Sequence, residues 1–487
     1  MTAGTQTDSS YLKEMLCSEL VDVVGEDDVT ERAADKLAYA CDYYWIPAMW
    51  IDRKCSPPTA DWIVHPESAE EVSRILKIAD RYHIPVVTWG GGSGSQGGAL
   101  PIYGGIILDT KKMNRVVKID HDAMTVTVQT GIITEHLEWA LQKEGVSTMH
   151  YPASIQCATL GGFLAHRGTG VLSTKYGKIE DMTVSMQVVL PDGKIINTLP
   201  VPRHAAGPDL NQIFLGSEGT LGVITEATLK IHPIPEARKF QAFVFNSMHE
   251  AMEAGKRIMI SRLGPSVIRL YDEAETKKLI KRVLGIDKTG AYLVFGFEGN
   301  EDIVDLQLQA AVKICLDLHA EDLGTEMGKS WWDNRYKFFY PPYMFALPQA
   351  FGTLDTVATF SNIENVYWGM KHAVETNFPE ATFIGHFSHW YDWGCMLYAR
   401  FIVDNPPEDP HEAAALYNRI WDTGVRASIA AGGVLNEHHG IGLKLGRLMK
   451  EQYGEAYSVL ERIKGALDPH NIMNPGKMGF SGVGGER

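Results

Sequence analysis

Two short segments in the last quarter of the sequence hold histidines in pairs. His386 and His389 are followed by Tyr391, and His438 and His439 are adjacent. An imidazole ring titrates near neutral pH, so it can serve as a general base or as a metal ligand. These segments therefore predict a site where a proton is removed from a substrate.

Glycine-rich loops earlier in the chain indicate a second kind of chemistry, the binding of an anion by backbone N–H groups. The first loop runs from Gly90 to Gly98, and two more occupy residues 152–162 and 216–226. Closely spaced glycines let the backbone approach a ligand and turn its N–H groups toward an anion. The first loop lacks the lysine and hydroxyl of a nucleoside-triphosphate loop. Three such loops indicate a long ligand that contains a pyrophosphate.

The elements that hold the first loop are predicted by the sequence around it. Ser68 and Glu71 have the spacing of a capping box, and the apolar residues that follow repeat at helical spacing. Residues 84–89 then form a buried strand that runs into the loop, and residues 105–110 and 124–130 form two more strands. The pattern predicts an α+β domain with a cofactor-type loop near its start.

A change in sequence character at HPIPE (232–236) divides the chain. Beyond it, strands mix with helices, and residues 331–343 are densely aromatic around Arg335. That stretch is either a core or dimer surface or the wall of a pocket for an aromatic substrate. Arg335 either anchors an anionic or phenolic oxygen there or stacks on a ring as a surface cation. We expect an N-terminal extension over 1–55, a first domain over 56–236, a second over 237–425 and a C-terminal segment over 426–487.

Composition excludes several classes of protein. The 487 residues are 45% hydrophobic, and 45 Lys and Arg against 60 Asp and Glu give a net charge of -15. A nucleic-acid partner needs a basic face, so we expect none. No stretch approaches the roughly 18 apolar residues of a membrane helix, so we expect no integral membrane segment and a cytoplasmic location. The six cysteines have no regular spacing, so neither a zinc knuckle nor a disulfide scaffold is indicated.

Four ordered motifs carry a resemblance to a known family. They are GGGSGSQGGALP, PASIQCATLGG, GSEGTLGVITE and DPHNIMNPGK, and they span about Asp61 to Lys477. Together they resemble the FAD-linked oxidase family with the vanillyl-alcohol-oxidase (PCMH-type) FAD-binding domain. The resemblance implies FAD as cofactor and an α+β fold. Its parts would be a PCMH-type FAD-binding domain of two subdomains, an α+β cap domain for the substrate, and a C-terminal segment that returns to the FAD-binding domain.

The resemblance also implies which residues bind FAD. Gly90 to Gly94 would hold the pyrophosphate, and Thr159 and the glycines after it would line the flavin. Gly219 and Ile224 would contact the adenine, the ribose or the flavin ring. Because the first loop contains neither His nor Cys, covalent attachment from that loop is excluded, whereas attachment from the cap domain stays open. The expected set is Gly90, Gly91, Gly92, Ser93, Gly94, Ser95, Gln96, Pro152, Ser154, Thr159, Gly161, Gly162, Glu218, Gly219, Gly222, Ile224 and Asn474.

Two branches of the family compete. The first glycine loop and EHHGIGLKL resemble the D-2-hydroxyacid dehydrogenase and glycolate oxidase branch. A larger set, RHAAGPDL, YGKIEDM, HFSHWYDWGCMLY and GTLDTVATFSNI, resembles alkyldihydroxyacetonephosphate synthase. The synthase carries an arginine in a PYLRD-like segment, where residues 342–346 here read PYMFA. That difference weakens the case for a phosphorylated lipid substrate.

The hydroxyacid branch builds a metal site from GHxGDGNLH, but residues 385–390 read GHFSHW, and His438 replaces the glutamate of EHGIG. We therefore expect no catalytic metal, although the four histidines could still cluster as nitrogen ligands.

The resemblance and the histidines together predict an FAD-dependent oxidoreductase, either an oxidase or a dehydrogenase. It would oxidise a hydroxyl- or amine-bearing carbon of a small, aromatic or lipophilic molecule by hydride transfer to flavin N5. A base must take the accompanying proton. We expect His439 or His389 as that base, with His438 and His386 orienting the substrate and Tyr391 as a further candidate.

Alternatives remain open. The chain could be an alkyldihydroxyacetonephosphate synthase-like transferase, a metal-assisted D-2-hydroxyacid dehydrogenase, or a flavin-binding subunit without catalysis. The expected electron acceptor is O2 or an electron-transfer partner, and the expected assembly is a homodimer.

Overall fold

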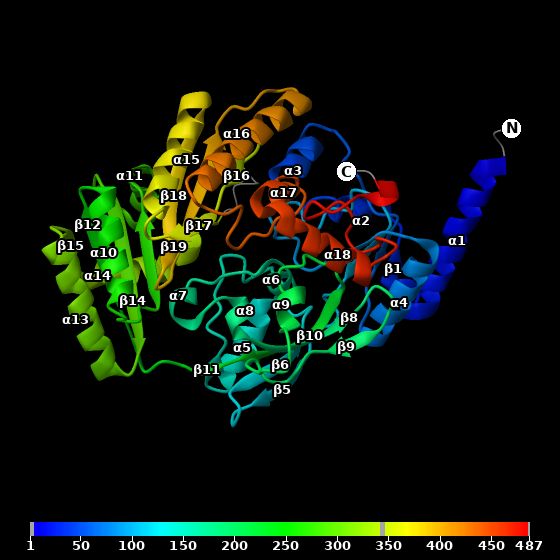
Figure 1. The fold of residues 1–487 in the computed structure, drawn as a ribbon, viewed down its shortest axis with the longest axis horizontal. Helices are drawn as coiled ribbons and strands as arrows, with labels where there is room; N and C mark the ends of the chain where they lie inside the picture. The colour runs from blue at the N-terminus through cyan, green and yellow to red at the C-terminus, as the bar shows by residue number, and fades with distance from the viewer. Residues whose placement is uncertain (1–3, 341–345, 486–487) are drawn as a thin grey trace.

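The computed structural model describes residues 4–340 and 346–485 (Figure 1). Most of the PYMFA segment over 342–346 lies outside the described residues. The chain forms mixed helix and sheet layers. In Figure 1 the N-terminal half and the C-terminal end lie together on one side, and the large sheet of the middle of the chain lies on the other.

The first sheet contains the strand that leads into the glycine loop. Helix α4 (Ala69–Tyr82) covers it, and Ser68 caps the helix by accepting the N–H of Glu71 at 3.2 Å, as the capping-box spacing predicts. Val72 and Ile75 on the inner face of the helix are fully buried. The strand order is β1 (Val29–Thr30), β2 (Trp62–Val64), β4 (Ile106–Asp109) and β3 (Val86–Trp89), with β2, β4 and β3 parallel.

The segment 1–55 is expected to be an extension, and it packs onto this sheet through β1. Its helices are α1 (Gly4–Val24), α2 (Ala33–Ala38) and α3 (Trp45–Asp52).

The second sheet is antiparallel and carries the other two glycine loops. Its inward residues, such as Val126 and Val128, pack with Leu137 and Leu141 of α5 (Thr134–Lys143). The strand order is β5 (Val116–Asp120), β6 (Thr125–Gln129), β10 (Val223–Lys230), β8 (Thr183–Val189) and β9 (Ile195–Asn197). Shorter elements beside it are β7 (Val146–Ser147), α6 (Leu160–His166), α7 (Ser173–Tyr176), α8 (Ile179–Met182), α9 (Asn211–Phe214) and β11 (His232–Pro233).

The third sheet is the large antiparallel sheet of the cap. One face is covered by α10 (Met248–Ile260), α13 (Glu301–Asp317), α15 (Ile363–Asn377) and α16 (Pro410–Ala430). Its other face packs partly on Met149, Val171 and Leu172 of the N-terminal half. The strand order is β15 (Glu321–Leu323), β12 (Ala237–Phe245), β14 (Ala291–Gly299), β13 (Val267–Tyr271), β18 (Ala381–Trp390), β19 (Gly394–Val403) and β16 (Ala350–Thr353), and β17 (Thr356–Thr359) also pairs with β19. The remaining cap helices are α11 (Glu273–Glu275), α12 (Lys281–Leu284) and α14 (Gly324–Asn334).

The aromatic stretch divides between core and cavity. Trp331 is buried, and its indole N–H donates to the Tyr271 hydroxyl at 2.8 Å. Phe338 is also buried in the same apolar cluster. Only Phe339 and Tyr340, at the end of the described part of this stretch, line a cavity. Trp331 and Phe338 therefore support the interpretation as core, and Phe339 and Tyr340 support the interpretation as the wall of a pocket.

After the cap, the chain returns to the first sheet through α17 (Met449–Tyr453) and α18 (Tyr457–Leu467). Met473 forms a parallel bridge with Val86 at the edge of β3. The Nζ of Lys464 donates to the carbonyls of Thr220 at 2.9 Å and Met473 at 2.7 Å and pairs with Asp468. This buried lysine holds the returning segment against the glycine loop at 216–226.

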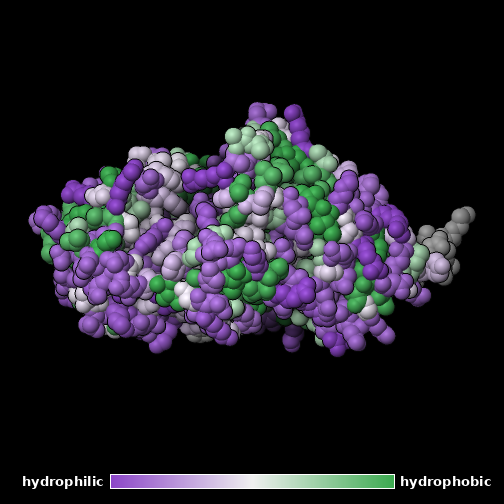
Figure 2. Space-filling model, turned by 90° about the horizontal axis from the view of Figure 1, so that it is seen from below, coloured by the Kyte–Doolittle hydropathy of each residue, from purple (hydrophilic) through white to green (hydrophobic). Residues whose placement is uncertain are grey.

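None of the helices within residues 4–340 and 346–485 is long and apolar enough to cross a membrane. Figure 2 shows hydrophilic side chains over most of the face seen from below, with apolar groups scattered among them.

We predict that Lys464→Met lowers the free energy of unfolding by about 3–5 kcal/mol, because Asp468 stays buried without its cation. The measurement is urea unfolding followed by tryptophan fluorescence. Lys450→Met is the matched control, since its ion pair with Glu461 is exposed and contributes about 1 kcal/mol or less. Equal losses in the two variants would contradict the role given to Lys464.

Candidate functional site

Two open cavities adjoin where the two halves of the molecule meet. The first, of about 960 Å³, is lined by the three glycine loops. The second, of about 1570 Å³, lies between the first loop and the cap sheet. They share the wall formed by residues 91–94, and His166 and His439 line both. A ligand in the first cavity would therefore meet a ligand in the second at these histidines.

The backbone around the first cavity is shaped for close approach by a ligand. A Cβ on Gly90 would collide with the side chain of Thr159, and one on Gly91 with the carbonyl of Cys157. Thr159 itself caps α6 by accepting the N–H of Gly162 at 3.2 Å. Only glycine fits at these two positions, so the loop can lie flat against the second glycine segment.

Three buried polar atoms around this cavity have no protein partner. They are Thr88 Oγ1, Gln96 Oε1 and Asp42 Oδ2. Unpaired polar atoms in a folded protein cost free energy, so a wall that gathers several of them fits a polar ligand. Together with the glycine cradle, they fit the FAD that the motifs imply.

Most of the expected FAD-binding residues line one of the two cavities. Asn474, in the returning segment, lies beside the first cavity. Its side-chain amide donates hydrogen bonds to the carbonyls of Gly98 at 2.8 Å and Glu218 at 2.7 Å. Burial raises the pKa of Glu218 to about 7, and its carboxyl accepts the N–H of Ile441 and Gly442. The first cavity is lined by Gly90, Gly91, Gly92, Ser93, Gly94, Gln96, Thr159, Gly161, Gly162, Glu218, Gly219, Gly222 and Ile224, and the second also by Ser95, Pro152 and Ser154.

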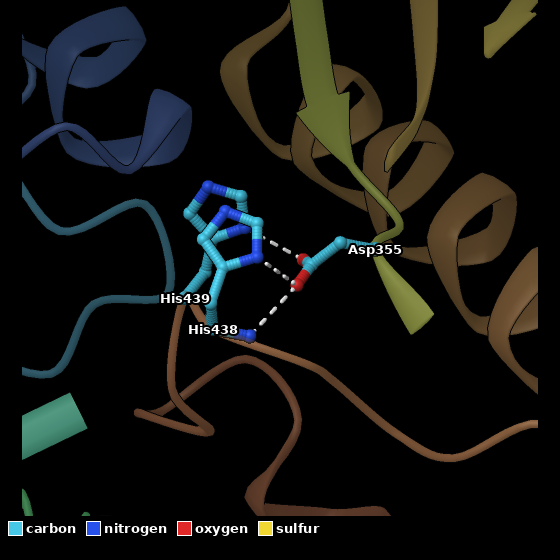
Figure 3. A group of neighbouring side chains, drawn as sticks. All are labelled: Asp355, His438 and His439. Carbon is cyan, nitrogen blue, oxygen red and sulfur yellow. Dashed lines mark hydrogen bonds and ion pairs between the residues drawn. The ribbon is translucent and has the colours of Figure 1, made fainter. Parts of the chain in front are cut away.

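His439 is oriented by a buried carboxylate. Its Nδ1 lies 2.7 Å from Oδ1 of Asp355, as Figure 3 shows. A carboxylate only accepts, so Nδ1 carries a proton, and Nε2 is the ring nitrogen left to accept one from a substrate. Burial alone would raise the pKa of Asp355, but the rings of His439 and His438 and the backbone N–H of Glu437 hold it well below its usual range. Asp355 is thus a lasting anion that fixes the tautomer of His439.

His438 and His389 converge on a second buried carboxylate, Glu437. Nδ1 of His438 lies 2.9 Å from Oε2 of Glu437, and Nδ1 of His389 lies 3.4 Å from the same oxygen without hydrogen-bond alignment. Burial lowers the pKa of His438 to about 3 and also lowers that of His389. Both rings are therefore neutral at physiological pH.

Tyr391 stands behind this carboxylate rather than among the residues that line the two cavities. Its hydroxyl donates to Oε1 of Glu437 at 2.5 Å, and burial raises its pKa well above the usual range. Tyr391 therefore positions Glu437.

His386 belongs to a different network, with two arginines. Its Nδ1 lies 3.1 Å from both oxygens of Glu275, so Nε2 accepts from Nη1 of Arg269 at 3.1 Å. Arg400 pairs with the same glutamate. Burial lowers the pKa of His386 to about 4, and both of its ring nitrogens are engaged. His386 therefore orients Arg269 and is not free to act as a base.

The arginine network faces the second cavity, whose lining also includes aromatic side chains. Arg269 and Arg400 both line it, and Nε of Arg269 has no protein partner. Phe163, Phe339 and Phe351 line the same space. The lining of the cavity thus has a cationic part, formed by the arginines, and an aromatic part, formed by the phenylalanines.

Arg335 lies apart from both cavities. Its guanidinium stacks over Trp332 at 3.9 Å and Tyr336 at 4.6 Å, and its Nη1 donates to Trp332 O. It does not line either cavity. The geometry favours the interpretation of Arg335 as a cation stacked on an aromatic ring.

Two groups of side chains have the composition of metal sites. They are Asp355 with His438 and His439, and His389 with Glu437 and His438. In the second group, however, Nζ of Lys178 lies 3.1 Å from Oε1 of Glu437. A lysine ammonium already neutralises that carboxylate, so this second group is a poor fit for a divalent metal.

Several residues at this site are not among those that the sequence predicts as functional. Asp355 stands in GTLDTVATFSNI and Glu437 directly precedes the histidine pair, so both lay inside singled-out segments. Lys178 lay in YGKIEDM, but its partner is 259 residues away. Arg269 and His166 carried no local signal.

Comparison with known proteins gives the same assignment over most of the chain. Residues 60–199 match the model of an FAD binding domain, and residues 234–478 match that of the C-terminal domain of FAD linked oxidases. The chain is 31% identical to alkyldihydroxyacetonephosphate synthase of Dictyostelium discoideum, covering 86% of this chain and 73% of that protein. It is 32% identical to the FAD-linked oxidoreductase YgcU of Escherichia coli K12, covering 96% and 98%. Mitochondrial D-lactate dehydrogenase (cytochrome) of Arabidopsis thaliana is 31% identical, covering 86% and 73%.

Solved structures agree on the fold. A structure of alkyldihydroxyacetonephosphate synthase superposes with a TM-score of 0.79 at 29% identity, covering 95% of this chain and 85% of that one. A structure of p-cresol methylhydroxylase with bound substrate superposes with a TM-score of 0.77 at 17% identity, covering 96% and 97%. The second likeness concerns the fold alone, and it matches the expected PCMH-type architecture.

We predict that Gly91→Val abolishes FAD retention, because its side chain collides with the Cys157 backbone where the glycine loops meet. The measurement is the flavin-to-protein absorbance ratio after gel filtration. Gly465→Ala, at an exposed position with no atom near the new Cβ, is the matched control and keeps a full complement of flavin. Normal flavin content in Gly91→Val would contradict this assignment of the first cavity.

Proposed function

We propose that this chain, which belongs to the FAD-linked oxidase family, oxidises a hydroxyl- or amine-bearing carbon of a small molecule that carries both an anionic group and an apolar portion. The observation that carries the proposal is the Asp355–His439 pair, in which the buried Asp355 holds His439, a side chain that lines both cavities. A base in that position is within reach of a substrate that faces the cofactor.

The chemistry divides between cofactor and protein. FAD, when bound, supplies the hydride acceptor N5. His439 takes the proton from the substrate oxygen or nitrogen on Nε2, because Nδ1 is held by Asp355. The imidazolium that forms is stabilised by the same carboxylate. His389 is the second candidate for the base, since it is neutral and lines the same cavity.

The cationic part of the lining of the second cavity supports an anionic substrate. Nε of Arg269 has no protein partner there, and a guanidinium binds carboxylate or phosphate with directed hydrogen bonds. The aromatic part of the lining supports an apolar portion on the same molecule. A 2-hydroxy acid with an aromatic or aliphatic side chain has both features.

A synthase-like transferase is the second candidate. It is favoured by the similarity to alkyldihydroxyacetonephosphate synthase. Such an enzyme would use the flavin without net oxidation of the substrate and would require an acylated ketone phosphate. The two candidates differ in whether a hydroxyl compound reduces the flavin.

The test is anaerobic titration of the FAD-loaded protein with hydroxy acids, aromatic alcohols and amines. Loss of the flavin band at about 450 nm with an anionic hydroxyl compound supports the oxidoreductase. A flavin band that no such compound bleaches, together with turnover of an acylated ketone phosphate, supports the transferase. Oxygen consumption after reduction separates an oxidase from a dehydrogenase. The homodimer stays a prediction, which gel filtration with light scattering tests.

We predict that His439→Gln and Asp355→Asn each slow flavin reduction by about 10²–10⁴-fold, the usual contribution of a general base. Stopped-flow absorbance with the substrate found above is the measurement, and flavin content is checked first. His372→Gln, an exposed histidine on α15, is the control and keeps the wild-type rate. If both site variants kept that rate, the base would have to be sought elsewhere, with His389→Gln as the next variant.

We predict that Arg269→Met raises KM for an anionic substrate by about 10–100-fold, because a hydrogen bond to a charged group contributes about 1.5–3 kcal/mol. KM for an uncharged alcohol of similar size should stay within about 3-fold. Steady-state kinetics on the two compounds provides the comparison. An equal rise for both would argue that Arg269 shapes the cavity rather than binding the anion.

A further inference from the structure

Lys178 is a buried cation behind the histidine cluster. It occupies the N-cap position of α8, and only 11% of its side chain is exposed. Its Nζ donates to the backbone carbonyl of Glu437 at 2.7 Å, lies 3.1 Å from Oε1 of Glu437 and 3.4 Å from Oε1 of Glu180. An ammonium has three N–H groups, and three oxygens surround this one. Lys178 is therefore held in place.

Because Lys178 fixes Glu437, Glu437 in turn positions the side chains that it contacts at the second cavity. One of its oxygens accepts from Tyr391, and the other contacts His438 and His389. Both histidines line the cavity, whereas Glu437 does not. Any shift of Glu437 would move both rings.

The same atoms form the donor set of a metal site. The ligand atoms of His389, Glu437 and His438 all lie within 4.8 Å of one another. Two imidazoles and one carboxylate bind Zn²⁺ in many enzymes. Here the ammonium of Lys178 already stands beside the only carboxylate of the three, so an incoming divalent ion would meet a neutralised ligand and a like charge.

We propose that Lys178 replaces a divalent metal in this cluster, holding Glu437 and through it His389 and His438 in position while keeping the site free of metal. Lys178 is a positioning residue, since the groups in the cavity are the histidines. The part of the inference that concerns turnover rests on the proposed function. The part that concerns metal exclusion does not.

The first test is equilibrium dialysis of the FAD-loaded protein against Zn²⁺, with bound metal measured by atomic emission. The wild type should show no zinc that depends on Glu437, so Glu437→Gln should bind the same amount. Lys178→Ala should gain about one equivalent of zinc, and Lys178→Ala/Glu437→Gln should lose it again. Lys178→Arg, which keeps the cation, should bind no more than the wild type.

Two results of this test would overturn the proposal. One is an equivalent of zinc in the wild type that Glu437→Gln removes. The other is a folded Lys178→Ala protein that gains no zinc. Should Lys178→Ala fail to fold, Lys178→Met keeps most of the side-chain volume and takes its place in the comparison.

The second test is the rate of flavin reduction. Lys178→Met should lower kcat at least 10-fold with KM changed less than 3-fold, and Lys178→Arg should recover most of the loss. Lys194→Met is the matched control, because Lys194 is 75% exposed and pairs with the nearby Asp192. Wild-type kcat in Lys178→Met would refute the positioning role. If no substrate reduced the flavin at all, the proposed function would fail while the zinc measurements still decided the role of Lys178.

Discussion

The arrangement of the site depends on the buried carboxylate of Asp355. It stands between β16 and β17 of the cap sheet and accepts hydrogen bonds from the side chain of Asn436, the backbone of Glu437 and His438, and the ring of His439. A fully buried anion is stable only when donors surround it, and here the donors are all supplied by residues 436–439. One side chain of the cap thereby fixes the segment that carries the histidine pair, its backbone path and the tautomer of the base.

Buried charges elsewhere in the site follow the same principle. Glu275 is balanced by Arg400 and accepts a hydrogen bond from the ring of His386, and Glu437 is balanced by Lys178. Each carboxylate is paired with a cation that comes from a different part of the chain. Nε of Arg269, a side chain that lines the second cavity, is left without a protein partner. The unpaired donor therefore stands where a substrate anion would bind.

The similarity to known proteins points to two kinds of enzyme. The chain matches the models of an FAD binding domain and of the C-terminal domain of FAD linked oxidases, and it is similar to an alkyldihydroxyacetonephosphate synthase and to a D-lactate dehydrogenase (cytochrome). Its histidine cluster has the composition of a metal site, but a lysine neutralises its glutamate. The cation beside this carboxylate supports the proposal that the site works without a divalent metal.

Local sequence determined much of the fold and the cofactor cavity. The Ser68 cap, the strand before Gly90 and the glycine loops depend on backbone preferences within a few residues, so their spacing predicted them. Asp355, Arg269 and Lys178 could not be placed that way. Arg269 reaches His386 only because β13 pairs with β18, and Lys178 meets Glu437 across 259 residues. The aromatic run at 331–340 shows the same limit, because its composition fits a core and a pocket equally. Burial and charge pairing between distant segments are set by packing, and only the tertiary structure decided them.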